Sequence, residues 1–223
     1  MVKQRKDFIP ASGYDWLLPL YDPVQRWLLR EDSLKRPLVD EARIQPGHSV
    51  LDIGCGTGTL TVLTARLHPE AQIFGLDPDP KALAIARRKA RNAGVRVQLD
   101  EGFSYDLPYP NGSVDRVLSS LMFHHLTSDE KIRTLTEVER VLARGGSFHL
   151  LDFGRPSSQL GRNLVRLVHW GDRARDNIEG RLPSFMTDTG FTDVQETGRR
   201  GIFVGSLSYY RASKAATSAL DAV

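Results

Sequence analysis

The sequence predicts an α/β fold with a doubly wound, mostly parallel sheet, and three observations lead to this class. Short apolar segments at 50–53, 72–76 and 114–118 alternate with longer amphipathic segments. The first two carry an acidic residue at or just after their ends, Asp52 and Asp77. A glycine-rich turn follows the first segment and opens into a helical pattern, as in the first βα unit of such a sheet.

The glycine-rich turn predicts a cofactor site. Gly54, Gly56 and Gly58 let the backbone turn tightly and let a ligand approach without a Cβ in the way. The helix that follows offers unpaired N–H groups at its start. The turn departs from the dinucleotide fingerprint G-x-G-x-x-G, because Thr59 stands where the last glycine belongs. Asp52, just before the turn, would repel a pyrophosphate but suits a ligand that carries an ammonium group.

The string D-I-G-C-G-T-G at 52–58 resembles the cofactor motif of class I S-adenosylmethionine-dependent methyltransferases, an acid and one apolar residue followed by G-C-G-x-G. The chain is most similar to the methyltransferase type 11 and quinone-methyltransferase-like group that acts on small molecules. The resemblance covers 50–153 and implies a Rossmann-like, seven-stranded sheet with a C-terminal antiparallel hairpin and N-terminal lid helices. It implies S-adenosylmethionine as the cofactor, bound by Asp52, Gly54, Cys55, Gly56 and Gly58.

The second predicted strand, 72–77, supplies the strongest single cofactor candidate. In a nucleotide site, an acid at the end of this strand can accept hydrogen bonds from both ribose hydroxyls, which points to Asp77, with Pro78 beside it. Asp79, followed by proline, is the better cap for the next helix, which we expect to end at Gly94.

A third strand, predicted at 95–99, leads to a segment that resembles the adenine-binding segment of the family. The resemblance implies cofactor contacts from Gly102, Phe103 and Ser104. Phe103 replaces the acid or asparagine of many relatives, so its contact with the adenine would be stacking. A backbone group of Ser104 would then supply the polar contact.

The fourth predicted strand, 114–120, contains the cofactor candidate Ser119 and leads to His124 and His125 at the edge where ligands of such sheets bind. Methyl transfer from a sulfonium depends mainly on orientation. A base is needed only where the acceptor must lose a proton, and an imidazole suits that task. Both histidines are therefore candidate catalytic bases, or residues that line the pocket.

The remainder of the chain predicts the elements that complete the sheet. Thr127 and Glu130 form a capping box for a helix that ends before Gly145-Gly146. Beyond it we expect a strand at 147–152, helices at 160–170 and 182–190, and a hairpin of strands at 191–197 and 202–211. His169 and Trp170 are candidate substrate contacts on the first of these helices.

The N-terminal segment 14–29 predicts one or two amphipathic helices, which Pro19 and Pro23 interrupt. The spacing of Tyr14 and Tyr21 resembles the leading helix of methyltransferases that act on quinones and other lipophilic molecules. That resemblance implies a lid over the cofactor pocket, with the two tyrosines as candidate substrate contacts.

Composition is that of one domain over 1–223, with 40% hydrophobic and 26% charged residues. We expect a lid region at 1–45, a cofactor-binding core at 46–153, a substrate-side insertion and hairpin at 154–211, and a disordered tail from 212.

Cys55 is the only cysteine, so no disulfide or thiolate zinc site can form within the chain, and a cytoplasmic location fits. We interpret it as a packed residue. No metal site, secretory signal or transmembrane segment is expected.

These observations predict an enzyme that transfers a methyl group from S-adenosylmethionine to a small, lipophilic acceptor at oxygen or carbon and releases S-adenosylhomocysteine. We expect a monomer or homodimer without specific nucleic-acid binding, because a net charge of +3 is mild. A non-catalytic cofactor-binding module and an enzyme that catalyses a non-methylating rearrangement stay open as alternatives. A nicotinamide-dependent oxidoreductase is disfavoured by the glycine spacing.

Overall fold

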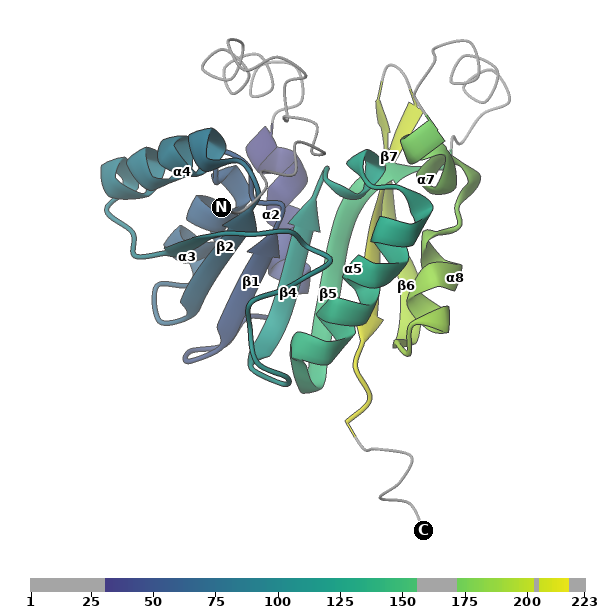
Figure 1. Ribbon diagram of the computed structural model, residues 1–223. Helices are drawn as coiled ribbons and strands as arrows, with labels where there is room; N and C mark the ends of the chain where they lie inside the picture. The colour runs from purple at the N-terminus through teal and green to yellow at the C-terminus, as the bar shows by residue number, and fades with distance from the viewer. Residues whose placement is uncertain (1–30, 156–171, 203–204, 217–223) are drawn as a thin grey trace, which may run out of the picture.

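The computed structural model describes residues 31–155, 172–202 and 205–216 (Figure 1). The helices expected before residue 31 and over 160–170 lie outside these ranges. Among the described residues, no helix has the length and apolar character needed to cross a membrane.

The described chain forms a seven-stranded sheet with the order β3-β2-β1-β4-β5-β7-β6. The strands are β1 (Ser49–Ile53), β2 (Gln72–Asp77), β3 (Gln98–Glu101), β4 (Val114–Ser120), β5 (Leu142–Gly154), β6 (Thr192–Ile202) and β7 (Gly205–Ser213). The strands β1 to β5 pair in parallel, whereas β7 is antiparallel to both β5 and β6. The predicted doubly wound sheet with a closing antiparallel hairpin is confirmed.

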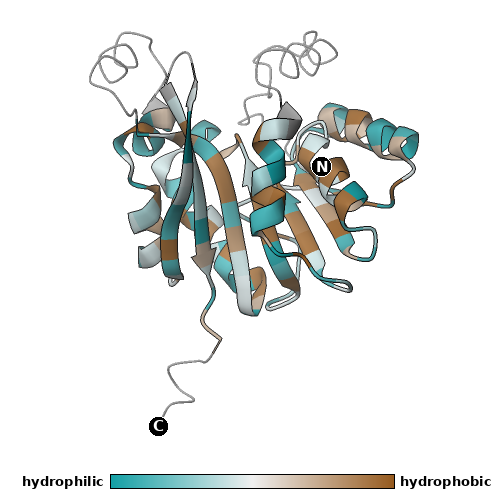
Figure 2. Ribbon diagram, turned by 180° about the vertical axis from the view of Figure 1, so that it is seen from behind, coloured by the Kyte–Doolittle hydropathy of each residue, from teal (hydrophilic) through white to brown (hydrophobic). Residues whose placement is uncertain are grey.

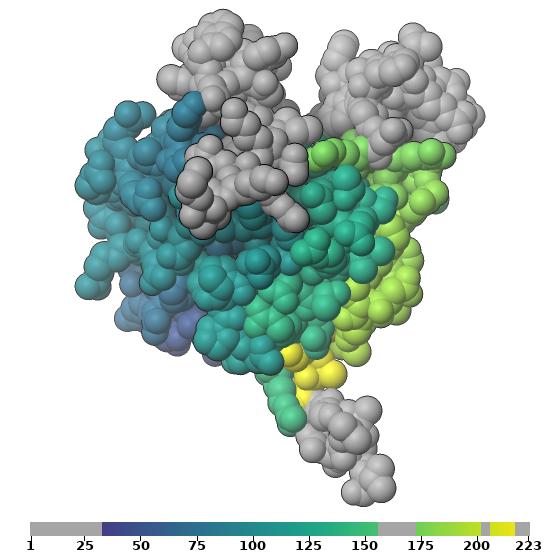
Figure 3. Space-filling model, viewed as in Figure 1, coloured from purple at the N-terminus to yellow at the C-terminus, as the bar shows by residue number. Residues whose placement is uncertain are grey.

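Helices cover both faces of this sheet (Figure 1). The helices of the described part are α2 (Glu31–Glu41), α3 (Thr59–Leu67), α4 (Pro80–Ala93), α5 (Ser128–Val141), α7 (Arg175–Glu179) and α8 (Leu182–Asp188), with short 3₁₀ turns η2 (Phe123–His125) and η3 (Asp172–Ala174). The helices α5 and α8 pack on one face, and α2 and α3 pack on the other. Figure 3 shows the α5 face, with α4 at one side of the molecule and α7 and α8 at the other.

Local signals start and stop the helices as predicted. The Asp79 carboxylate accepts a hydrogen bond from Lys81 N at 2.8 Å and caps α4, which Gly94 ends with a φ of 66°. At the start of α5, Thr127 and Glu130 form the expected capping box, in which each side chain binds the other residue's backbone N–H.

The core lies on both faces of the sheet. Leu150 and Leu151 are neighbours on β5 and both are fully buried, each in the cluster of a different face. Successive strand residues point to opposite faces, so a sheet covered on both sides needs apolar residues at both positions. Figure 2 shows hydrophobic residues along the middle strands and many hydrophilic residues on the helix in front of them.

The third strand begins later than predicted. Val95 N donates to Ala90 O at 3.1 Å and so completes the C-terminal cap of α4 instead of starting a strand. The pairing of β3 with β2 starts at Gln98, opposite Phe74. The predicted strand at 95–99 is therefore wrong at both ends, because the helix cap takes up its first residues.

The strand β7 continues past residue 212, where a tail is predicted to begin. Ala212 is fully buried and lies opposite Phe148 in the pairing of β7 with β5. Both residues belong to the core cluster on the α5 face. A small side chain fits between the sheet and the helices there, so composition alone is misleading and the prediction of a tail from 212 is wrong.

Two further strands are longer than predicted. The strand β5 begins at Leu142, which already has an extended backbone at the end of α5. The strand β6 continues through Gly198 and Gly201, where a break between strands is expected from the glycines. The pairing of β6 with β7 shifts in register at irregular positions, one of them between Glu196 and Gly198, and these shifts allow β6 to continue through the glycines.

Candidate active site

The turn between β1 and α3 is shaped by contacts that a side chain would block. A Cβ on Gly54 would collide with the Met122 side chain, and a Cβ on Gly58 would lie 2.6 Å from that of Ala86. Gly56, with a φ of 53°, differs because a Cβ there would have no heavy atom within 4 Å. The turn is therefore packed tightly at both ends and open at its centre.

Asp77, at the end of β2, supports this turn from the side. Its Oδ2 accepts a hydrogen bond from Gly56 N at 2.8 Å, and its Oδ1 accepts one from Asp79 N at 2.9 Å. The residue is 9% exposed, and burial raises its pKa to about 6. Each carboxylate oxygen has a second lone pair, so Asp77 can accept further hydrogen bonds from a ligand.

Asp52 is a buried carboxyl group near the end of β1. Thr61 Oγ1 on α3 donates to its Oδ2 at 2.6 Å. Burial raises the pKa of Asp52 to about 7, while the Thr61 hydrogen bond and the positive charge of Lys35 oppose that effect. A cation close to this carboxyl group would therefore stabilise its charged form.

Cys55 lies within the turn, and Ser119 lies near the end of the neighbouring strand β4. The Cys55 Sγ packs against Gly75, where a Cβ would lie 3.1 Å from it, and burial raises the pKa of the thiol. This environment agrees with the interpretation of Cys55 as a packed residue. Ser119 is fully buried and its Oγ donates to Ile53 O at 3.2 Å, which ties β4 to β1.

The segment after β3 reaches the same edge of the sheet. Gly102 N donates to Asp77 O at 3.2 Å. The half-buried ring of Phe103 stacks on Tyr105, with ring centroids 5.1 Å apart. Ser104 Oγ is hydrogen-bonded to Thr134 Oγ1 of α5 at 2.9 Å. This bond engages the serine side chain, and the contact of the Ser104 backbone with a ligand stays a prediction.

His124 and His125 form the turn η2 after β4, with ring centroids 4.0 Å apart. His124 Nδ1 lies 2.9 Å from Oδ1 of Asp152, a fully buried residue near the end of β5. Asp152 also accepts from Phe123 N at 2.8 Å and from Phe153 N at 2.7 Å. The carboxylate thus fixes both the backbone of the turn and the ring of His124.

The charges of this group follow from its contacts. Asp152 is fully buried, which disfavours its charged form, but His124 and the backbone donor outweigh burial and hold the pKa of Asp152 below its usual value. Burial and the neighbouring His124 lower the pKa of His125 to about 4. Near neutral pH, an ionised Asp152 therefore stands beside His124, and His125 is uncharged.

These groups meet where the order of strands reverses. The strand β1 pairs with β2 on one side and with β4 on the other. The glycine turn follows β1, Asp77 ends β2 and η2 follows β4, so all lie along one edge of the sheet (Figure 1). Ligands of doubly wound sheets bind at such a switch point, outside the carboxyl ends of the strands.

Known proteins resemble this chain over the same region. A family model described as a methyltransferase domain matches residues 50–146. An uncharacterized methyltransferase of Synechocystis is 37% identical over 169 residues, which cover 74% of this chain and 77% of that protein. The chain belongs to the class I S-adenosylmethionine-dependent methyltransferases.

Two further proteins also resemble the chain. A demethylmenaquinone methyltransferase of Thermus thermophilus is 37% identical over 142 residues, 63% of this chain and 64% of that enzyme. The chain therefore spans slightly less than two thirds of that relative. The structure of the YcgJ protein of Bacillus subtilis superposes with a TM-score of 0.66 at 16% identity, covering 82% of this chain and 98% of that one. This likeness supports the Rossmann-like fold.

Most of the site residues predicted from the methyltransferase motifs gather along one edge of the sheet. They are Asp52, Gly54, Cys55, Gly56, Gly58, Asp77, Pro78, Gly102, Phe103, Ser104, Ser119, His124 and His125. The predicted substrate contacts Tyr14, Tyr21, His169 and Trp170 lie outside the described residues. Sequence reasoning missed Asp152 as the partner of His124. The available signal was that Asp152 ends the strand after the histidines, since neighbouring parallel strands end at the same edge.

Proposed function

We propose that this protein transfers a methyl group from S-adenosylmethionine to a small, lipophilic acceptor and releases S-adenosylhomocysteine. The observation that carries the proposal is the meeting of an open glycine turn at the ends of β1 and β2 with a histidine–aspartate pair at the ends of β4 and β5. When bound, S-adenosylmethionine supplies an electrophilic methyl group on a positively charged sulfur. The chain's own residues would hold this donor, orient the acceptor and take up a proton.

The residues present fit this cofactor. The open centre of the turn at Gly56 admits a ligand next to the backbone. Asp77 retains lone pairs for the ribose hydroxyls. Asp52 is a buried carboxyl group whose charged form a nearby ammonium group would stabilise, and the cofactor carries one. The ring of Phe103 offers an aromatic face for the adenine.

We assign the role of general base to His124. An ionised Asp152 only accepts hydrogen bonds, so it holds the imidazole proton on Nδ1 and leaves Nε2 free to accept a proton. His124 Nε2 would take the acceptor's proton while the acceptor oxygen or carbon bonds to the methyl group and the methyl–sulfur bond breaks. His125, with a pKa of about 4, would line the pocket as a neutral ring.

The acceptor we propose is a hydroxylated aromatic ring that carries a hydrocarbon tail. A demethylmenaquinone methyltransferase is among the chain's relatives, and its name gives a quinone, whose reduced form is a hydroxylated aromatic ring. Removing a proton from a ring hydroxyl activates both that oxygen and the adjacent ring carbon. The same base would therefore serve methylation at oxygen or at carbon. After methylation at carbon, the methylated ring position loses its own hydrogen as a proton and the oxygen regains a proton, so the ring becomes aromatic again. The product distinguishes the two.

Binding tests the cofactor half of the proposal. Calorimetric titration with S-adenosylhomocysteine is expected to show binding, and NADH is the control ligand. Asp77→Ala should weaken the affinity about 10- to 100-fold, the loss expected for hydrogen bonds to a charged group. Asp79→Ala is the matched control, since it removes the cap of α4 and leaves the Asp77 carboxylate in place. Binding of NADH instead, or of neither ligand, would contradict the proposal.

Turnover tests the acceptor half. The enzyme is incubated with methyl-labelled S-adenosylmethionine and a short-tailed demethylmenaquinol, a naphthol or a catechol. Mass spectrometry detects transfer of the label, and NMR of the product separates methylation at carbon from methylation at oxygen. Cofactor binding without transfer to any acceptor would favour a non-catalytic module that only binds S-adenosylmethionine.

A further inference from the structure

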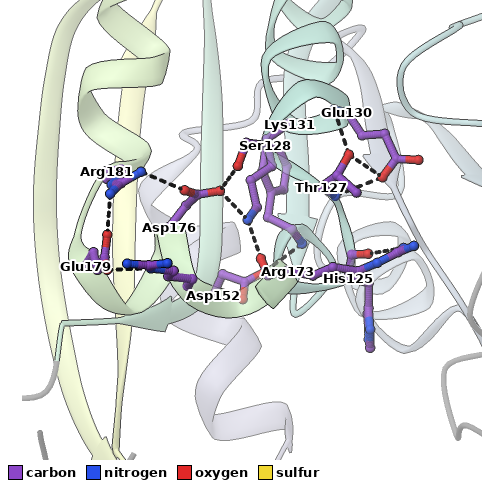
Figure 4. A network of polar contacts seen from close by, with 12 residues as sticks. His125, Thr127, Ser128, Glu130, Lys131, Asp152, Arg173, Asp176, Glu179 and Arg181 are labelled. Atoms are coloured by element: carbon purple, nitrogen blue, oxygen red, sulfur yellow. Dashed lines mark hydrogen bonds and ion pairs between the residues drawn. The ribbon is translucent and has the colours of Figure 1, made fainter. Parts of the chain in front are cut away.

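Lys131, in the first turn of α5, is a lysine with no exposed surface. Its Nζ donates to Oδ2 of Asp176 at 3.0 Å and to the backbone carbonyl of Arg173 (Figure 4). Burial lowers the pKa of Lys131, and the hydrogen bond and charge of Asp176 oppose this effect. A buried ammonium group is stable only when it is paired and hydrogen-bonded, so these contacts with η3 and α7 are essential to its burial.

Asp176, on α7, is held by several donors. Its Oδ2 accepts from Ser128 Oγ at 2.7 Å as well as from Lys131, and its Oδ1 lies 3.5 Å from a guanidinium nitrogen of Arg181 (Figure 4). Burial alone would raise the pKa of Asp176, but these donors outweigh it and lower the pKa. The charged pair of Lys131 and Asp176 thus attaches α7 to the first turn of α5.

The same lysine is connected to the histidine turn by a short path. Arg173, whose carbonyl binds Lys131, donates from Nη1 to the backbone carbonyl of His125 at 2.9 Å (Figure 4). On the other side of the turn, Asp152 binds Phe123 N and the ring of His124. The turn is therefore held by β5 from one direction and by η3 from the other.

We propose that Lys131 is a positioning residue for methyl transfer, which fixes the His124–His125 turn through Arg173 and Asp176. The inference rests on the proposed function in assigning a role to His124. Lys131 does not contact the His124 ring in any hydrogen bond of the described chain, so its effect is exerted through the backbone of the turn.

Stability alone does not explain a buried lysine at this position. Replacing a buried ion pair with apolar residues of similar volume is often neutral or stabilising. An ammonium group, however, can donate three hydrogen bonds from one point, and Lys131 uses this capacity to join a side chain of α7 to the backbone of η3. An apolar residue would fill the space without fixing the direction of Arg173.

Hydrogen exchange of the His125 and Leu126 amides measures the position of the turn without an acceptor. Lys131→Met is expected to speed their exchange about tenfold or more, because a charged hydrogen bond that restrains the turn is lost. Lys214→Met is the matched control: Lys214 donates to Glu139 O near the opposite end of α5. In the Lys214→Met variant, the amides of the histidine turn should exchange at the wild-type rate. An equal increase of the exchange rate in both variants would overturn the proposal.

A double variant separates positioning from simple ion-pair stability. Lys131→Met/Asp176→Asn removes both buried charges, so its thermal stability is expected to recover relative to Lys131→Met. We expect the exchange in the turn to stay fast, because the contact with the Arg173 carbonyl is still missing. Recovery of slow exchange together with stability would show that the pair is only structural.

Arg173→Gln tests the path itself, and it is the variant to rely on if Lys131→Met does not fold. Alone it should speed exchange of the turn, and adding it to Lys131→Met should cause no further increase. Fully additive effects would overturn the proposed path.

Where an acceptor is turned over, Lys131→Met should lower kcat about tenfold and leave the KM for S-adenosylmethionine unchanged. Because exchange is read without an acceptor, failure of the proposed function and failure of this inference are distinguishable.

Discussion

The carboxyl groups of Asp52 and Asp77 stand on neighbouring strands, and both are buried. Burial raises the pKa of Asp52 to about 7 and that of Asp77 to about 6, and the charge of Asp77 adds to the shift of Asp52. Each carboxyl group is therefore harder to ionise in the folded chain than in water. Groups of this kind lower the stability of the free protein and become favourable when a complementary ligand binds.

The pH dependence of stability should show the cost of Asp52. Its folded pKa lies above its unfolded value, so the destabilisation is complete above about pH 7 and disappears as the pH falls toward the unfolded pKa. Asp52→Asn should therefore stabilise the cofactor-free protein by roughly 1–3 kcal/mol at about pH 8, and by much less at about pH 5. Urea denaturation at the two pH values measures this difference. Asp188→Asn, at an exposed position, is the control, and a pH-independent effect of Asp52→Asn would contradict the assignment.

The two histidines should differ in their effect on catalysis. His124 is bonded to Asp152, whereas the pKa of His125 is lowered to about 4. His124→Asn is expected to lower kcat about 10²- to 10⁴-fold, the usual contribution of a general base. His125→Asn should have a much smaller effect, and both variants should bind S-adenosylhomocysteine like the wild type. Equal losses of kcat in the two variants would indicate that both rings only line the pocket.

At the scale of elements, the turn between β1 and α3 combines two functions in one short segment. Its outer glycines allow close contact with Met122, two residues after β4, and with Ala86 of α4, while its central glycine leaves space at the edge of the sheet. Close packing at the ends holds the turn rigid, and the open centre admits a ligand to the backbone. Substitutions at the different glycines should therefore act on different properties.

A substitution at Gly58 should mainly lower the stability of the protein, whereas a substitution at Gly56 should mainly lower its affinity for the ligand. Gly58→Ala places a Cβ 2.6 Å from that of Ala86 at a φ of 77°, so it should destabilise the protein by roughly 1–3 kcal/mol. Ala86→Gly should restore part of that loss. Gly56→Ala meets no atom and should cost only about 1 kcal/mol for its backbone conformation, but it should weaken binding of S-adenosylhomocysteine. Thermal melts and calorimetry on both variants test this, and the reverse pattern would refute it.

At the scale of the whole molecule, the site is assembled from one edge of the sheet. Strands β1, β2 and β4 each deliver a group to it. The segment after β3 adds the Gly102 backbone, and the segment after β5 adds Arg173 and Asp176, which bind Lys131 of α5. A ligand at this edge would contact segments that are separated by long stretches of sequence. Binding should therefore stabilise the fold as a unit.

Ligand binding should raise the melting temperature of the entire domain. At 100 times its dissociation constant, S-adenosylhomocysteine should add about 2.7 kcal/mol. For a chain of this length, that corresponds to an increase in Tm of roughly 5–10 °C. Differential scanning calorimetry should show one shifted transition, with NADH as the control ligand. An unchanged Tm at saturating ligand would argue against this site.

Much of the architecture is encoded in local sequence. The glycine turn, the Asp79 cap of α4 and the capping box of Thr127 and Glu130 involve residues within a few positions of each other, and the structure contains each of them. The parallel strands are also predicted from local sequence, because short apolar segments of strand length indicate them. Backbone preferences and short-range hydrogen bonds suffice for these features.

Only the tertiary structure decides the contacts between distant segments. Asp152 meets His124 from 28 positions away, and Asp176 meets Lys131 from 45 positions away. Composition predicts a loose tail from 212, yet Ala212 is buried opposite Phe148 because the sheet continues there. The order of the strands in the sheet depends on how the apolar faces of the whole chain pack together. The residues next to a strand in the sequence therefore do not determine which strands lie beside it. The sequence by itself therefore determined the elements and the cofactor turn, whereas packing determined which side chains meet at the site.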